Sequence, residues 1–119
     1  MADPIYVWVY GTLKTGYCNN VLLSSSKFIQ QATTKPKYKI YDCGMYPCMI
    51  KHEKGNSIIG EVFEIDIATL ANLDRLEGVP FLYRREEIEL EDFNAPTLAY
   101  FYQDTVEDFI DCGSSWPRK

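Results

Sequence analysis

A single stretch of this sequence carries the full set of signals for an α-helix, and short strand-like segments lie on both sides of it. Asp66 fits the N-cap position, because its side-chain oxygen can accept hydrogen bonds from first-turn amides. Gly78 fits the position just beyond the last turn, where glycine often ends a helix in a left-handed conformation. These signals predict one helix over residues 67–77 and favour a fold that combines this helix with a sheet.

The other regular elements are predicted strands. Residues 5–10 form a continuous β-branched and aromatic run, which is typical of a buried strand. Further strands are expected at residues 27–35, 38–41, 47–51, 57–65, 83–90 and 97–102, with a short helix at 17–23. Residues 53–56 predict a hairpin turn between the strands on either side, because Gly and Asn tolerate positive φ. The chain beyond residue 102 is expected to be irregular.

These elements predict the α+β fold class. Strands that follow one another along the chain pair mostly in an antiparallel way, so we expect a mixed, mostly antiparallel, curled or β-barrel-like sheet with one main helix. The 119 residues contain no repeat, low-complexity tract or linker, which predicts one domain over residues 1–119.

Charge and hydropathy limit the partners. The net charge is −5 and the basic residues are scattered, which disfavours nucleic acid because phosphate contacts need concentrated positive charge. No apolar run is long enough to cross a bilayer, and the N-terminus carries no basic region typical of a secretory signal. We therefore expect a cytoplasmic protein that binds neither nucleic acid nor membrane.

The four cysteines point to no metal or redox motif. Cys18, Cys43, Cys48 and Cys112 form no C-x-x-C pair, and in a reducing compartment we expect free thiols that pack as small hydrophobic groups. The alternative is a metal site that combines Cys43, Cys48 and Cys112 with His52. Its spacings do not match the common zinc patterns, so no metal is expected.

Glu77 lies on the apolar side of the predicted helix. Leu70, Leu73 and Glu77 are spaced by three and four residues and share one face. Burial and the negative end of the helix dipole would both raise the pKa of this carboxyl, which suits proton transfer near neutral pH. Helix position alone favours another interpretation, a surface carboxylate paired with Arg84 or Arg85, because most charged side chains are solvated.

The first predicted strand leads into a loop bounded by Gly11 and Gly16. A strand followed by such a loop and a helix presents backbone amides to an anion. A nucleotide-binding P-loop needs Lys and a hydroxyl residue after its second glycine, and Tyr17 and Cys18 stand there instead. Nucleotide hydrolysis is therefore excluded, and a carboxylate ligand fits the loop as well as a phosphate would.

Support for a protein nucleophile is weak. His52, the one histidine, lies beside the predicted turn at 53–56, where it is expected to be exposed. Without a base in a held orientation, the serines and cysteines have no evident activating partner. The charged run at residues 84–87 is expected to be a solvated strand face. Tyr83 could be core or a hydrogen-bond donor in a pocket, and Trp116 could form a cavity wall or cap the core.

Several short motifs occur in order over nearly the whole chain. They are Val9-Tyr10-Gly11-Thr12-Leu13-Lys14 with Gly16, then Asn20 and Leu22, Tyr46-Pro47, Gly60-Glu61-Val62-Phe63, Leu73-Asp74-Arg75-Leu76-Glu77-Gly78 and Tyr83-Arg84-Arg85. Together they resemble the gamma-glutamylcyclotransferase family, and most closely its gamma-glutamylaminecyclotransferase-like branch. The resemblance implies a small mixed β-barrel with helices and a cavity at one end.

The resemblance also implies an activity. Members of the family cyclise a gamma-glutamyl group to 5-oxoproline and release a free amine, with the substrate's own α-amine as nucleophile and without a cofactor. Glu77 matches the family's catalytic glutamate. The loop of Tyr10, Gly11, Thr12 and Leu13 matches the segment that binds the glutamyl moiety, largely through backbone groups.

Two questions stay open at this level. Thr12 and Tyr83 are further candidates for substrate binding, and the loop amides could hold either the α-carboxylate or an oxyanion. The protein could catalyse a related acyl transfer or cyclisation on another gamma-glutamyl compound, such as a peptide, or the domain could be a non-catalytic module that binds a small carboxylate. Glu77 argues against the last alternative, because a carboxylate-binding pocket gains nothing from a second negative charge.

Overall fold

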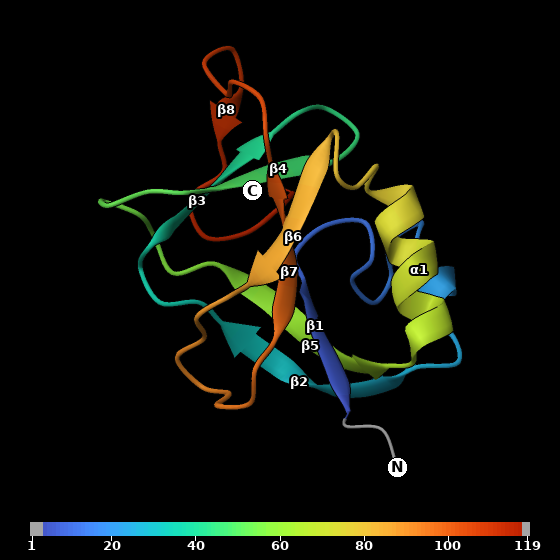
Figure 1. The fold of residues 1–119 in the computed structure, drawn as a ribbon. Coiled ribbons are helices and arrows are strands. Elements are labelled where there is room, and N and C mark those ends of the chain that lie inside the picture. The colour runs from blue at the N-terminus through green and yellow to red at the C-terminus, as the bar shows by residue number, and fades with distance from the viewer. Residues whose placement is uncertain (1–3, 118–119) are drawn as a thin grey trace.

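The computed structural model describes residues 4–117 (Figure 1). The prediction that a secretory signal is absent rests partly on Met1 to Asp3, which lie outside the described residues. The elements are β1 (Ile5–Val9), the 3₁₀ helix η1 (Asn20–Leu23), β2 (Lys27–Thr33), β3 (Tyr38–Asp42), β4 (Pro47–Lys51), β5 (Ile59–Ile65), α1 (Ile67–Leu76), β6 (Tyr83–Glu87), β7 (Leu98–Tyr102) and β8 (Ile110–Asp111). The predicted α+β class with one main helix is confirmed.

The strands form two sheets. The larger sheet has the order β2-β5-β1-β7-β6 and the smaller has the order β4-β3-β8. All pairs are antiparallel except β1 with β7, which confirms the mostly antiparallel pairing. No ladder joins the two sheets into a closed barrel within the described residues. In Figure 1 the smaller sheet lies across one end of the larger one, and α1 lies to one side of the strands, where it contacts η1.

The predicted hairpin between residues 47–51 and 57–65 is wrong. β4 pairs with β3, with Tyr41 opposite Cys48, whereas β5 pairs with β1 and β2 in the other sheet. Residues 53–56 therefore cross between the sheets, and Asn56 donates its backbone N–H to the carbonyl of Tyr38 at 2.7 Å. The alternation of side chains fixes which face of a strand is buried, but it does not select the neighbouring strand.

The end of the chain also carries a strand that the sequence did not predict. β8 pairs with β3, with Tyr41 opposite Asp111 and Asp42 opposite Ile110. Both residues of β8 are exposed, so the apolar alternation that identifies a strand is missing from this segment. The smaller sheet thus needs a segment from beyond residue 102.

The central strand β1 separates two hydrophobic cores. Val7 and Val9 point to the core that contains Leu73 of α1, whereas Trp8 and Tyr10 point to the core between the two sheets. Alternate side chains of a strand point to opposite faces, so a strand buried on both faces has no polar side. This explains the continuous apolar run in the sequence and places the end of β1 between the helix and the smaller sheet.

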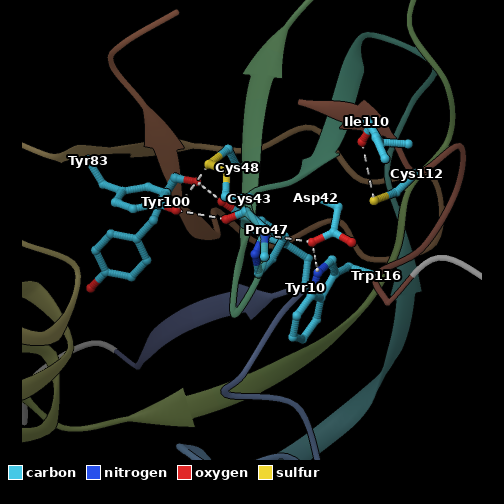
Figure 2. The surroundings of a disulfide bond; sticks show 11 residues. Tyr10, Asp42, Cys43, Pro47, Cys48, Tyr83, Tyr100, Ile110, Cys112 and Trp116 are labelled. Atoms are coloured by element: carbon cyan, nitrogen blue, oxygen red, sulfur yellow. Dashed lines mark hydrogen bonds between the residues drawn. A yellow bond between two sulfur atoms is a disulfide. The ribbon is translucent and has the colours of Figure 1, made fainter. Parts of the chain in front are cut away.

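The expectation of four free thiols is wrong for one pair. Cys43 and Cys48 form a disulfide, with their Cα atoms 6.4 Å apart (Figure 2). Antiparallel pairing of β3 and β4 brings these two residues together across a short connection, which the spacing in the sequence does not reveal. The disulfide also removes both residues from the alternative metal site. No helix in the described part of the chain is long and apolar enough to cross a membrane.

Candidate active site

The helix α1 places Glu77 at a defined position. Asp66 accepts a hydrogen bond from the Thr69 backbone N–H at 2.7 Å, which confirms the predicted N-cap. At the other end the Glu77 backbone N–H donates to the carbonyl of Leu73 at 2.9 Å, and Gly78 adopts the expected left-handed conformation with φ +64°. Leu73 is fully buried under the helix. Glu77 is therefore the C-cap residue that follows the last turn of a capped and anchored helix.

The loop after β1 packs directly against the connection between β3 and β4. A Cβ atom on Gly11 would lie 2.6 Å from Cγ of Pro47, so only glycine allows this approach. Asn19 closes the loop by donating its backbone N–H to the Thr12 carbonyl at 2.9 Å and its side-chain amide to the Thr12 hydroxyl at 2.8 Å. Within residues 4–117 no hydrogen bond uses the backbone amides of Gly11, Thr12 or Leu13.

The helix expected after this loop is only a short turn. The segment predicted as a helix at 17–23 contains η1, which is four residues long and has no side-chain N-cap. Such a short 3₁₀ turn has little dipole, so the loop offers an anion its individual amides rather than the terminus of a long helix. Val21 to Leu23 are apolar, but only Leu23 is buried, so this segment lacks the buried face that would stabilise a longer helix.

One cavity of about 360 Å³ brings all the predicted site residues together. Its lining contains Tyr10, Gly11, Thr12 and Leu13 from the loop, Glu77 from the end of α1 and Tyr83 from the start of β6. These segments are far apart in the sequence. The cavity forms where the end of β1, the C-terminus of α1 and the β3–β4 connection meet.

Sequence reasoning missed the contribution of the β3–β4 connection. Met45, Tyr46 and Pro47 line the cavity, and so do Cys18 and Asn19 from the first loop. Tyr46 and Pro47 form one of the short motifs that occur in order along the chain, and this motif could have marked them as candidate site residues. Their place beside Gly11 follows only from the pairing of β3 with β4.

Three buried tyrosines form a hydrogen-bonded wall of the cavity. Tyr83 donates its hydroxyl to the Pro47 carbonyl at 2.7 Å, and Tyr10 donates to the Tyr100 carbonyl at 2.6 Å (Figure 2). The Tyr100 hydroxyl in turn donates to Asp74 at 2.8 Å. Burial raises the pKa of all three phenols, so each stays protonated near neutral pH. Tyr83 is thus both a core residue and a hydrogen-bond donor, and its proton is already used by the protein.

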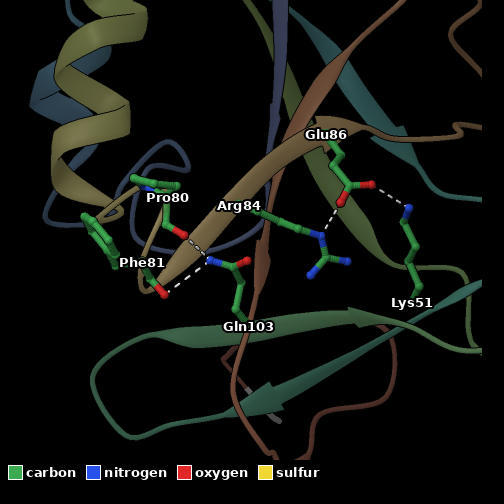
Figure 3. A network of polar contacts seen from close by, with 6 residues as sticks. All are labelled: Lys51, Pro80, Phe81, Arg84, Glu86 and Gln103. Atoms are coloured by element: carbon green, nitrogen blue, oxygen red, sulfur yellow. Dashed lines mark hydrogen bonds and ion pairs between the residues drawn. The ribbon is translucent and has the colours of Figure 1, made fainter.

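The carboxyl group of Glu77 has no partner among the described residues. Arg84 contacts Glu86 on its own strand, and Arg85 contacts Asp74 of α1, so the alternative interpretation, a Glu77 paired with either arginine, is wrong. Figure 3 shows the side chain of Arg84 directed toward Glu86, away from the end of the helix. The Glu77 side chain is half-buried, and desolvation raises its pKa from 4.5 to about 7.

The pKa of Glu77 predicts a stability cost that depends on pH. A folded-state pKa above the ordinary value means that the folded protein holds the proton more tightly than the unfolded chain, so stability falls as pH rises from 4.5 to 7. We expect Glu77→Gln to be more stable than the unaltered protein by about 1–3 kcal/mol at pH 8 and nearly equal to it at pH 4.5. Urea unfolding of both proteins at the two pH values measures this, and an identical difference at both would contradict it.

Two other candidates lie away from the cavity. His52 is exposed, and its Nδ1 accepts the Lys54 backbone N–H at 3.0 Å. Trp116 is buried in the core between the sheets and donates its Nε1–H to Asp42 at 3.4 Å, which fits a residue that caps the core. Cys18 is the one thiol on the cavity lining, and the histidine that could activate it is not there.

The structure is that of an α+β protein with one cavity whose lining carries a carboxyl group, Glu77, that pairs with no other described residue. Residues 7–118 match the family model described as gamma-glutamyl cyclotransferase, AIG2-like. The chain belongs to this family.

Individual relatives agree with this assignment. A protein of Vibrio cholerae with the printed name "Putative gamma-glutamylcyclotransferase" is 44% identical over 109 residues, which cover 90% of this chain and 91% of the relative. The gamma-glutamylaminecyclotransferase of Bos taurus is 34% identical over 106 residues, which cover 81% of this chain and 63% of the relative. The crystal structure of an AIG2-like protein from Mus musculus has the same fold, with a TM-score of 0.79 at 22% identity over 91% of this chain and 83% of that one.

Proposed function

We propose that this protein is a gamma-glutamyl amine cyclotransferase, which converts the gamma-glutamyl group to 5-oxoproline and releases the amine. The observation that carries this proposal is the Glu77 carboxyl group, which lines the cavity, has no partner among residues 4–117 and has its pKa raised to about 7 by burial. A carboxylate that neither binds a cation nor stabilises the fold is suited to a proton-transfer role.

In the proposed reaction Glu77 moves one proton. An α-ammonium group has a pKa of about 7.7–8.0, so a carboxylate with a pKa of about 7 is well matched to remove its proton. The freed amine then attacks the γ-carbonyl carbon and forms the ring C–N bond. Glu77 returns the proton to the departing nitrogen as the original amide bond breaks, the ring nitrogen gives up its second proton to the released amine, which leaves as an ammonium ion, and the Glu77 carboxylate ends as it began.

The substrate supplies its own nucleophile, so the protein mainly has to hold the glutamyl chain in attack geometry. Ring closure within one molecule removes the entropic cost of bringing two reactants together. The unused amides of Gly11, Thr12 and Leu13 are donors for the α-carboxylate or for the oxyanion that forms on the γ-carbonyl. The reaction needs no cofactor, since every transferred atom comes from the substrate or from Glu77.

The same cavity is compatible with two alternatives to the proposed function. The printed name of the Bos taurus relative supports an amine substrate, whereas the name of the Vibrio cholerae protein specifies no leaving group. A gamma-glutamyl peptide is therefore the alternative substrate. A non-catalytic carboxylate-binding module is less well supported, because the unpaired carboxyl of Glu77 would repel its ligand. The cytoplasmic location and the one-domain organisation stay predictions.

A substrate panel tests the proposal. The protein is incubated with gamma-glutamyl-ε-lysine, gamma-glutamyl dipeptides and glutathione, and 5-oxoproline is measured. We expect release from gamma-glutamyl-ε-lysine. Release from the peptides alone would support the alternative substrate, and the absence of 5-oxoproline with every compound would contradict the enzymatic function.

A further inference from the structure

Arg85 lies on the face of β6 that borders the cavity. It follows Tyr83 by two residues, and alternate side chains of a strand share a face. It is also directly opposite Tyr100 of β7, and residues opposite each other in a ladder are neighbours on the same face. Tyr83 and Tyr100 both line the cavity, so a permanent cation lies close to the cavity that contains Glu77.

Asp74 of α1 holds this cation. Its carboxylate accepts hydrogen bonds from the Arg85 guanidinium and, at 2.8 Å, from the Tyr100 hydroxyl. The side chains of Asp74 and Arg85 are both partly buried, where an unpaired charge would be costly. The ion pair therefore neutralises two charges beside the cavity and fixes the direction of the arginine.

Glu77 is close enough to compete for the same arginine. Asp74 precedes it by three residues, and helical residues three apart are neighbours, with about 5–6 Å between their Cβ atoms. The pKa of the Tyr100 phenol reflects the same proximity: burial raises it most, and the charges of Asp74, Arg85 and Glu77 all act on it. An arginine released from Asp74 could therefore contact Glu77 by a change of side-chain conformation.

Within residues 4–117, no other cation is in a position to pair with Glu77. The cavity lining contains no Lys or Arg, and its other titratable side chains, none of which becomes cationic, are Tyr10, Cys18, Tyr46, Tyr83 and Tyr100. Arg75 is exposed and donates to Asn72, and it lies two residues from Glu77, a spacing that does not place side chains together. The 3₁₀ helix η1, which packs against α1, carries no charge.

We propose that Asp74 is a positioning residue that holds Arg85 away from Glu77 and so keeps the Glu77 carboxyl group free to accept the substrate's proton. This inference rests on the proposed function and extends it to a residue that does not line the cavity. A released Arg85 would stabilise the Glu77 carboxylate, which makes it a weaker base, and would take the place of the substrate's ammonium group.

Asp74→Asn tests the inference. The amide keeps the shape of the side chain and an oxygen for the Tyr100 hydroxyl, but it has no charge to hold the guanidinium. We expect the acidic limb of the kcat/KM profile, with a midpoint near pH 7 in the unaltered protein, to move down by about one pH unit. At pH 8.5, kcat/KM should fall by about 3- to 10-fold, because the base is weaker and paired.

A measurement without substrate gives the same quantity independently. The ¹³C NMR signal of the Glu77 carboxyl group, assigned by its loss in Glu77→Gln, reports the midpoint directly. We expect the same lowering in Asp74→Asn. Circular dichroism checks folding, and Asp74→Ser, which also removes the charge, is the second variant if the amide does not fold.

Further variants separate the release of Arg85 from general effects. Asp74→Asn/Arg85→Gln also lacks the cation, so the midpoint should return to near pH 7. Arg85→Gln alone should not lower it, because the remaining Asp74 carboxylate repels charge on Glu77. Glu86→Gln is the matched control: it frees Arg84 on the opposite face of β6 and should leave the midpoint unchanged.

The outcomes separate the two proposals. A midpoint near pH 7 in folded Asp74→Asn would overturn the positioning role, and so would a lowering that persists in the double variant or occurs equally in Glu86→Gln. Each of these results leaves the cyclotransferase function intact if 5-oxoproline is formed. If the unaltered protein forms no 5-oxoproline from any substrate of the earlier panel, the proposed function fails, while the NMR midpoints still show whether Asp74 controls the charge of Glu77.

Discussion

Replacing Glu77 by Gln is expected to lower kcat for 5-oxoproline release by about 10²–10⁴-fold. The amide has nearly the same shape as the carboxyl group but cannot accept the proton of the substrate's α-ammonium. The side chain has no hydrogen bond or ion pair to other described residues, so the substitution breaks no structural contact. Initial rates at saturating gamma-glutamyl substrate, with unfolding curves for both proteins, measure this effect.

The pH profile and a matched control make this prediction sharper. Because the reaction needs the ionised form, kcat/KM should fall below pH 7 with a midpoint near the pKa of about 7, and the residual activity of Glu77→Gln should lack this limb. Glu87→Gln makes the same chemical change at an exposed position outside the cavity and should keep nearly full activity. A folded Glu77→Gln protein with full activity would rule out the proton-transfer role.

Replacing Gly11 by Ala is expected to be the second large effect. The new Cβ would lie 2.6 Å from Cγ and 2.7 Å from Cδ of Pro47, so the loop and the β3–β4 connection must separate. Pro47 also accepts the Tyr83 hydroxyl, and its neighbour Tyr46 lines the cavity, so the shift reaches the site directly. We expect kcat/KM to fall by about 10²-fold and stability by about 1–3 kcal/mol.

A second substitution tests the physical cause of this loss. Pro47→Ala removes both clashing atoms and keeps the carbonyl that Tyr83 uses, so the double variant Gly11→Ala/Pro47→Ala should recover a large part of the lost activity and stability. The coupling between the two changes can be read from a double-mutant cycle of kcat/KM and of urea unfolding. Strictly additive losses would show that contact with Pro47 is not the reason for glycine at position 11.

Features that depend on neighbouring residues could be predicted well. The helix begins after Asp66 because that side chain caps its own first turn, and it ends before Gly78 because glycine adopts a left-handed conformation at low cost. The strand at the start of the chain was evident because both of its faces are buried, which makes the whole segment apolar. Each of these signals acts within one or two turns of chain.

Features that depend on distant pairing could not be predicted. β4 follows the expected boundaries but pairs with β3 instead of β5, and this choice creates the Cys43–Cys48 disulfide. It also brings Tyr46 beside the first loop. Strand periodicity is the same whichever neighbour is chosen, so the sequence pattern contains little information about partners.

For Glu77, some properties follow from the neighbouring sequence and others only from the tertiary structure. The local pattern was enough to place a carboxyl group at the C-terminal end of an amphipathic helix, and the motifs made it a candidate for catalysis. That no other described residue pairs with it was decided by the tertiary structure, because Arg84 and Arg85 are held by Glu86 and by Asp74. Its raised pKa also depends on the tertiary structure, because the residues that exclude water from the Glu77 carboxyl group come from separate segments of the chain.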